Sequence, residues 1–183
     1  EQFLGEVIVH KGRGISVEPK PEVRKAGGVY YTPKYIVDYI VENTVGEKLK
    51  KCKTPKDVSA IKIVDPACGS GSFLLGTYDV LVEWHLNYFK IQVDKLLKNG
   101  KTILQVNKKF RNEIKCYPID PDFKSNKYTL HLTSKLKKQI LTNNLFGVDI
   151  DDNAVEITKF SLSMKALEDT THDELYEDYD LFN

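Results

Sequence analysis

The stretch from Ile63 to Leu74, IVDPACGSGSFL, constrains the fold more than any other part of the chain. The apolar run Ile61 to Val64 predicts a short buried strand that ends at Asp65. Two glycines separated by one serine then predict a tight turn, and helical spacing of apolar residues from Phe73 to about Phe89 predicts a helix. The chain is therefore expected to contain a strand, a tight loop and a helix in direct succession.

A second unit of the same kind follows later in the chain. Leu132 to Asn143 has helical spacing, Leu145 to Val148 is another short apolar run, and Asp152 to Leu167 predicts a helix capped by an aspartate. A strand followed by a helix, twice over, favours a parallel sheet with helices packed on it. The predicted fold class is α/β.

The N-terminal part is predicted to consist of a helix, a linker and a second helix. Apolar residues within Glu1 to His10 follow the spacing of a helix face, and residues 11–28 have the glycines, prolines and charges of a connecting loop. The next helix has Thr32 as its candidate N-cap and Pro33 at its first helical position. The abrupt start of the chain suggests a piece of something longer.

Size and composition fit one soluble domain. The chain has 183 residues, of which 41% are hydrophobic and 29% charged, which is enough for a single core. We assign residues 1–28 to the N-terminal helix and linker and residues 29–183 to the domain. No apolar run is long enough for a transmembrane helix, so no membrane partner is expected and the cytoplasm is the simplest location.

No metal site is expected from the cysteines and histidines. The cysteines are widely spaced and lack the pairing of a zinc site: Cys52, Cys68 and Cys116. The histidines are scattered, and a solvated or helix-surface position is expected for each: His10, His85, His131 and His172.

Charge is unevenly distributed, although the net charge is only +1. From Lys90 to Lys138 there are thirteen basic and four acidic residues, whereas from Asp149 to Asn183 there are eleven acidic residues and two lysines. A basic stretch suits contacts with phosphate groups, but a lysine-rich face is often only solvated. The sequence leaves both readings open.

The glycine-rich turn favours a nucleotide-like ligand, because the ligand can approach the backbone and the next helix offers free N–H groups. No lysine follows Gly71, which argues against the phosphate-binding loop of nucleoside triphosphate enzymes. The spacing after Gly69 and Gly71 also differs from that of dinucleotide-binding loops. Asp65 would repel a pyrophosphate but suits an ammonium group, and S-adenosylmethionine carries an ammonium and a sulfonium.

The loop DPACGSGSFL resembles the cofactor loop of the amino-group DNA methyltransferases, in particular the adenine-N6 methylases of type I and type IIG restriction-modification systems. Gly27 to Pro33, GGVYYTP, resembles the segment that precedes this loop in the family and closes over the methionine end of the cofactor. Ile140 to Leu167 resembles the family's second strand and the helix after it. Glu1 to Ile8, EQFLGEVI, resembles the helix that leads into this domain in type IIG enzymes.

This resemblance implies a Rossmann-like S-adenosylmethionine-dependent methyltransferase fold and a cofactor site. In the family the acid corresponding to Asp149 takes the two ribose hydroxyls, and the residue corresponding to Ile150 packs on adenine. The implied cofactor-binding residues are Tyr31, Thr32, Pro33, Asp65, Pro66, Ala67, Cys68, Gly69, Ser70, Gly71, Ser72, Phe73, Asp149 and Ile150. The implied reaction is direct methyl transfer to N6 of a flipped adenine in double-stranded DNA, without a metal.

Some of these residues also have a structural explanation. A carboxylate at a strand end, such as Asp149, can accept two hydrogen bonds from a ribose diol, and the aspartates after it suit the helix cap better. Thr32 can contact the cofactor, cap its helix, or do both. Cys68 is expected to fill space in the loop rather than to act as a nucleophile. Phe73 is expected to pack either on the cofactor or in the core.

The catalytic loop of the family is absent from this sequence. That loop has an Asn/Asp-Pro-Pro-Tyr/Phe motif, and no two of the seven prolines here are adjacent. We therefore expect a domain that is truncated after the second core strand and helix, with a helical insertion at about 90–138, and that is inactive alone. Whether the insertion lies near the DNA or only supports the domain stays open.

The sheet edge and the partners follow from the same resemblance. In the family the fourth strand borders the first, so the edge of Ile61 to Val64 would be free, and either self-association or cover by the linker or insertion is expected. Double-stranded DNA is expected to bind mainly through parts outside this chain. The alternatives are part of an RNA or protein-glutamine methyltransferase, or a non-catalytic binding module, and Asp65 and Asp149 argue against the module.

Overall fold

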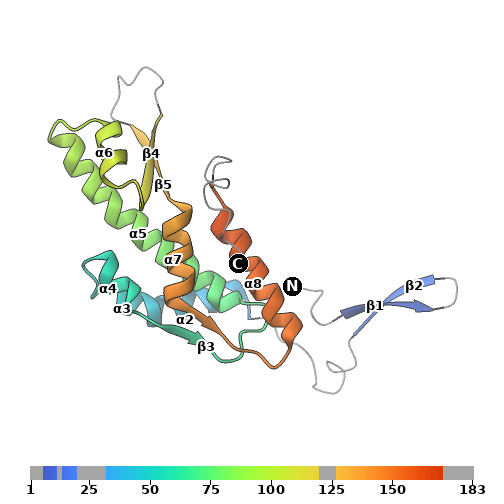
Figure 1. Ribbon diagram of the computed structural model, residues 1–183. Helices are drawn as coiled ribbons and strands as arrows, with labels where there is room; N and C mark the ends of the chain where they lie inside the picture. The colour runs from blue at the N-terminus through green and yellow to red at the C-terminus, as the bar shows by residue number, and fades with distance from the viewer. Residues whose placement is uncertain (1–5, 12–13, 20–31, 120–126, 171–183) are drawn as a thin grey trace.

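The computed structural model describes residues 6–11, 14–19, 32–119 and 127–170 (Figure 1). In chain order its elements are β1 (Glu6–Lys11), β2 (Gly14–Pro19), α2 (Lys34–Val41), the π-helix η2 (Glu42–Gly46), α3 (Glu47–Leu49), α4 (Pro55–Ser59), β3 (Ile63–Asp65), α5 (Ser72–Lys98), α6 (Ile103–Lys109), β4 (Ile114–Pro118), β5 (Tyr128–Leu132), α7 (Ser134–Asn144), β6 (Leu145–Gly147) and α8 (Asp152–Leu167).

Strands β3 and β6 form the parallel pair that the sequence predicts. Ile63 is paired with Leu145 and Asp65 with Gly147. Helix α5 follows β3 and helix α8 follows β6, so both strand–helix units are confirmed. Because the strands are parallel, the loops after them meet at one edge of the sheet, and this places the two predicted cofactor segments side by side.

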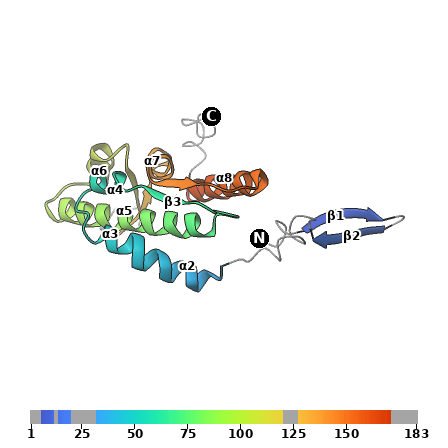
Figure 2. The same cartoon turned by 90° about the horizontal axis from the view of Figure 1, so that it is seen from below.

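Helix α5 is the centre of the core. It lies between α2 on one side and α7 and α8 on the other (Figure 2). Its buried side chains include Leu74, Leu81, Phe89 and Val93, each no more than 3% exposed. These residues recur at intervals of four, seven and eight, which keeps them on one face of the helix.

Helix α2 begins one residue later than the sequence predicts. Pro33 is its N-cap, in an extended conformation with ψ of 144°, and no side chain caps the helix. The Pro33 carbonyl accepts hydrogen bonds from the N–H groups of Ile36 and Val37, at 2.9 and 3.2 Å. The prediction of Thr32 as N-cap was therefore wrong, since Pro33 takes that position itself.

A π-helical turn keeps one apolar stripe of this helical segment on the core. The buried residues are Val37, Val41, Val45 and Leu49, at a strict spacing of four. In a regular α-helix each such step passes a full turn by about 40°, so the stripe would rotate away from the core. The wider turn of η2, which contains Val45, compensates for that drift.

The prediction of a helix within Glu1 to His10 was wrong for the residues of this segment that the structure describes. Glu6–Lys11 is strand β1, which pairs antiparallel with β2 over Gly14–Pro19, in a segment predicted as a loop. Val7, Ile8 and Val9 are three consecutive β-branched residues, which favour a strand over a helix. Residues 1–5 and 20–31 lie outside the described part of the chain.

The insertion at about 90–138 was expected to be helical, but it contains two strands as well as helices. Helix α6 is capped reciprocally by Thr102 and Gln105, but β4 and β5 form an antiparallel hairpin. Ile114 and Cys116 point inward at alternate positions of β4, and each is no more than 1% exposed. The period of two in this short stretch is the strand signal that the sequence analysis missed. Residues 120–126 are not described.

Candidate functional site

Backbone hydrogen bonds join the two loops at the carboxyl ends of β3 and β6. The Val148 N–H donates to the Asp65 carbonyl, and the Cys68 N–H donates to the Val148 carbonyl, both at 2.9 Å. The Gly69 N–H donates to Oδ2 of Asp149 at 2.8 Å. Residues about eighty positions apart in sequence are therefore joined at one edge of the sheet.

The glycine-rich turn requires both glycines. Gly69 and Gly71 have φ of +52° and +81°, in the left-handed region that side chains disfavour. A Cβ on Gly71 would lie 2.7 Å from Cγ2 of Thr158. Thr158, on α8 and 4% exposed, also donates a 2.8 Å hydrogen bond from Oγ1 to the Gly69 carbonyl. The sequence analysis missed Thr158, whose signal was a polar residue on the buried face of a predicted helix.

Cys68 fills space inside the loop, as expected. It is 6% exposed, and a Cβ on Gly147 would lie 3.1 Å from its Sγ. Burial raises the pKa of the Cys68 thiol, and the charges of Asp149 and Asp65 raise it further. A protonated, packed thiol is a poor nucleophile, so its part in the site is to shape the loop.

The Asp149 carboxylate accepts two backbone hydrogen bonds and can accept more. Its Oδ1 accepts from the Asp151 N–H at 2.9 Å, and its Oδ2 accepts from Gly69. The hydrogen bond from Asp151, followed by that from Gly69, lowers the pKa of Asp149 below its usual range. Each carboxylate oxygen has a second lone pair, so the group can still accept two hydroxyls. Asp151, the N-cap of α8, fills the capping role instead, as predicted.

Asp65 has one oxygen without a partner. Its Oδ1 accepts from the Ala67 N–H at 3.2 Å. Its Oδ2 is buried and has no hydrogen-bond partner among the described residues. A buried carboxylate oxygen without a donor is costly, and an ammonium group is the kind of donor that satisfies it. The site therefore fits the amino-acid end of S-adenosylmethionine.

Two pockets adjoin the loop. One, of about 380 Å³, brings Thr32 and Pro33 together with Ser72 at the start of α5. The other, of about 280 Å³, is lined by Asp65 and Phe73 together with residues of α2 and η2. Phe73 is also packed against the core, so its two predicted roles are compatible in this structure.

The remaining predicted residues differ in their exposure. Pro66 and Ala67 are exposed, and Ser70 Oγ lies 3.4 Å from Ser72 Oγ. Ile150 is fully exposed, next to Asp149, which leaves its side chain open to a ligand. Tyr31 lies outside the described residues.

The family model of the MmeI DNA-methyltransferase domain matches residues 41–178. The chain belongs to this family. The match contains both the glycine-rich loop and Asp149, whereas Thr32 and Pro33 precede it. The methyltransferase resemblance drawn from the sequence is thus confirmed, and both loops lie within the part of the chain that matches the MmeI-type domain.

Two curated relatives agree with the MmeI-type assignment. The type II restriction enzyme and methyltransferase RM.Eco57I of Escherichia coli is 28% identical over 97% of this chain, which spans 15% of that protein. The adenine-specific methyltransferase BrxX of Escherichia coli O9:H4 (strain HS) is 25% identical over 82% of this chain, which spans 12% of that protein. The chain thus covers a small part of the length of these relatives.

Three further observations bear on the sequence predictions. Within residues 6–11, 14–19, 32–119 and 127–170 there is no group of three or more His, Cys, Asp or Glu side chains arranged to hold a metal ion. None of the helices in that part of the MmeI-type chain is both long and apolar enough to cross a bilayer. His85 is only 2% exposed, so its predicted surface position was wrong.

Proposed function

We propose that this chain is the S-adenosylmethionine-binding part of a DNA adenine-N6 methyltransferase of a restriction-modification protein. The observation that carries the proposal is the pair of carboxylates at the carboxyl edge of the sheet. Asp65 has a buried oxygen without a hydrogen-bond partner among the described residues, and Asp149, 84 positions later in the sequence, has spare lone pairs and is hydrogen-bonded to the same loop. Membership of a DNA-methyltransferase family and an adenine-specific relative support the substrate class.

Each residue has a binding role in this proposal. Asp65 would hold the ammonium group, and the first turn of α5 would offer N–H groups to the carboxylate of the same amino acid. Asp149 would accept the ribose hydroxyls, and Ile150 would cover the adenine. The cofactor supplies a methyl group activated by a sulfonium. Thr32 and Pro33, which line a pocket with Ser72, would close the amino-acid end.

Methyl transfer itself is not expected from this chain alone. The Asn/Asp-Pro-Pro-Tyr/Phe motif that positions the target amino group in the resembling enzymes is missing from the sequence. Binding of the cofactor and transfer to DNA are therefore separable. We expect incubation of the chain with radiolabelled S-adenosylmethionine and duplex DNA to leave the DNA unlabelled.

Calorimetric titration of the chain with S-adenosylmethionine tests the binding role. We expect saturable binding by the wild type and at least a tenfold loss in Asp65→Ala and in Asp149→Ala, because each removes a charged hydrogen-bonding partner worth about 1.5–3 kcal/mol. Asp152→Ala is the matched control, since Asp152 is exposed in the first turn of α8. Equal affinity in all four proteins, or no heat from a folded wild type, would rule the proposed site out for this chain.

A further inference from the structure

A separate pocket of about 430 Å³ lies between α4, α5, α7 and the turn that joins α6 to β4. Its volume is within the usual range for small-ligand sites, about 300–1,000 Å³. Tyr88 lines it from α5, sixteen residues after Ser72. At roughly 1.5 Å per residue, that places it about 24 Å along the helix from the glycine-rich loop. The pocket is therefore distinct from the candidate cofactor site.

One wall of this pocket is aromatic. Tyr88 and Phe110 line it, and Phe89 packs edge-on against Phe110 with 5.5 Å between ring centroids. Tyr88 is stacked on Trp84, with centroids 5.5 Å apart and 9° between the planes, which holds the Tyr88 ring in one orientation. A partly exposed, oriented aromatic ring suits stacking by a planar ring of a ligand.

Polar side chains in the pocket have hydrogen-bonding capacity left. His85 Nδ1 lies 2.8 Å from the Leu81 carbonyl, so Nδ1 carries the hydrogen and Nε2 remains an acceptor. Burial lowers the pKa of His85, which keeps the ring neutral. The side-chain amides of Gln139 and Asn143 make no hydrogen bond within the described part of the chain. Amide and imidazole groups beside an aromatic ring can recognise the edge of a nucleobase.

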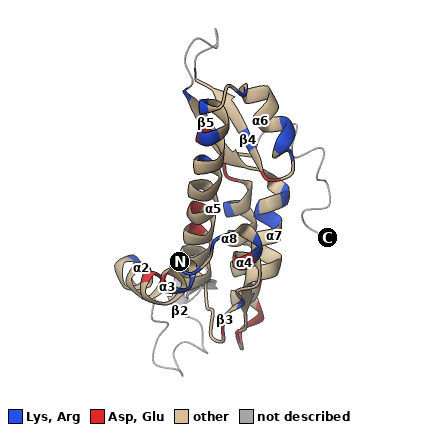
Figure 3. Ribbon diagram, turned by 90° about the vertical axis from the view of Figure 1, so that its left-hand side faces the viewer, with Lys and Arg blue, Asp and Glu red and all other residues tan. Residues whose placement is uncertain are grey.

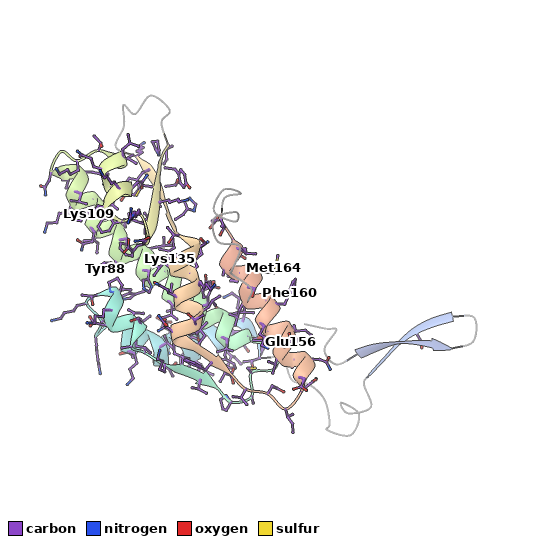
Figure 4. All side chains as sticks on the ribbon, viewed as in Figure 1. Tyr88, Lys109, Lys135, Glu156, Phe160 and Met164 are labelled. Carbon is purple, nitrogen blue, oxygen red and sulfur yellow. The ribbon has the colours of Figure 1, made fainter. Side chains whose placement is uncertain are left out.

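Lys56 is the one lysine among the lining residues, and two further lysines, Lys109 and Lys135, directly precede the lining residues Phe110 and Leu136. Lys109 lies with its Nζ 5.2 Å from the centre of the Phe110 ring, and Lys135 Nζ is 3.4 Å from Oδ1 of Asn112. Figure 4 labels Lys109 on α6, Lys135 on α7 and Tyr88 on α5. Neither lysine forms an ion pair with any residue that the structure describes. Glu113 is the one carboxylate among the lining residues.

The surface around the pocket is also rich in positive charge. Over residues 90–119 and 127–138 there are twelve Lys or Arg and two Asp or Glu. One of those acids, Asp94, accepts a hydrogen bond from the Tyr128 hydroxyl at 2.6 Å. Figure 3 shows Lys and Arg positions over α6 and α7, and residues of α7 line the pocket. Such a positive field concentrates anions near this surface.

We propose that this pocket binds a nucleotide, with its base stacked on Tyr88 and its phosphate between Lys109 and Lys135. The aromatic wall matches the base, the imidazole and amide groups match its polar edge, and the lysines next to the pocket match the phosphate. The nucleotide is either free or part of a single strand. This site is additional to the proposed methyltransferase function and does not depend on it.

Trp84 offers a direct measurement, because it is the only tryptophan and stacks on the Tyr88 ring that lines the pocket. Its fluorescence is followed while ATP, AMP, adenosine or a short oligodeoxyadenylate is added to the chain with excess S-adenosylhomocysteine present. We expect ATP to change the emission saturably and adenosine to bind about tenfold more weakly than ATP, since it lacks the phosphates. Tighter binding of the oligonucleotide than of AMP identifies a strand as the source, and the reverse order identifies a free nucleotide.

Charge variants locate the binding. Lys109→Glu and Lys135→Glu together are expected to weaken ATP binding at least about tenfold, and Glu113→Gln to tighten it about threefold. Lys159→Glu, on α8, is the matched control and is expected to bind within about twofold of wild type. Asp149→Ala should also leave ATP binding unchanged, which separates this site from the cofactor site. The proposal is overturned by unaltered fluorescence at millimolar nucleotide, by loss of the signal in Asp149→Ala, or by equal affinity of the lysine variants and wild type.

Discussion

The conformation of Gly71 is enforced by a neighbouring helix as well as by its own backbone. Its φ of +81° disfavours any side chain, and an added Cβ would also lie only 2.7 Å from Cγ2 of Thr158. Thr158 cannot turn away without losing its hydrogen bond to Gly69. The loop is therefore locked from the side of α8, a contact that neither strand–helix unit makes by itself.

Gly71→Ala is expected to lower the free energy of unfolding by about 2–4 kcal/mol, from left-handed strain of about 1–2 kcal/mol and overpacking against Thr158. Gly100→Ala is the matched control, because Gly100 has φ of +78° and nothing within 4 Å of an added Cβ. It should lose only the strain, about 1–2 kcal/mol. Urea unfolding measures both, and equal losses would mean that the contact with Thr158 contributes nothing.

Asp149 gives the stability a pH dependence of definite sign. Its pKa is lower in the folded chain than its ordinary value of 3.8, so the folded state favours the ionised group. The resulting stabilisation is complete above the unfolded pKa and is lost as the pH falls through the folded pKa. We expect Asp149→Asn to be less stable than wild type at neutral pH and the gap to close below about pH 4. Urea unfolding across pH, with Asp152→Asn as control, detects this; a gap independent of pH contradicts it.

At the scale of the elements, local signals predicted the two strand–helix units well. The predicted strands, Ile61 to Val64 and Leu145 to Val148, are short apolar runs followed by strong loop and cap signals, and strands are found at Ile63–Asp65 and Leu145–Gly147. The β1–β2 hairpin was missed because Val7 and Ile8, together with two apolar residues before them, imitate a helix face. The close approach of Thr158 to the loop was beyond sequence reasoning, since it depends on how α8 packs.

Strand β3 has a free edge in the part of the chain that the structure describes. It pairs with β6 on one side, and Val64 is 60% exposed. An unpaired apolar edge offers N–H and C=O groups to another chain. We therefore propose self-association through β3 at high protein concentration.

Val64→Lys is expected to reduce this association, because a charged side chain at a sheet edge disfavours pairing. Leu104→Lys is the matched control, since Leu104 is 73% exposed on α6, away from the sheet. Light scattering after size-exclusion chromatography, over a range of concentrations, measures the mass. A wild-type monomer throughout, or the same mass for both variants, would refute the role of the β3 edge.

At the scale of the whole molecule, the proposed cofactor site is formed by three segments that are far apart in sequence. Thr32 and Pro33 precede α2, the glycine-rich loop precedes α5, and Asp149 precedes α8. These three helices pack around one core, with α5 in the middle. A site formed by all three segments exists only in the folded chain. Binding of a ligand there therefore adds to global stability.

Thermal unfolding with S-adenosylmethionine measures this coupling. At a ligand concentration of about 100 times Kd the stabilisation is about 2.7 kcal/mol, which for a domain of this size raises Tm by about 5–10 °C. Asp149→Ala should lose the ligand-dependent rise even where its own Tm is lower, because the comparison is made with and without ligand for each protein. Asp152→Ala should keep it. A rise that persists in Asp149→Ala would show that the ligand stabilises the chain from a different place, and the carboxylate pair would then lose its proposed role.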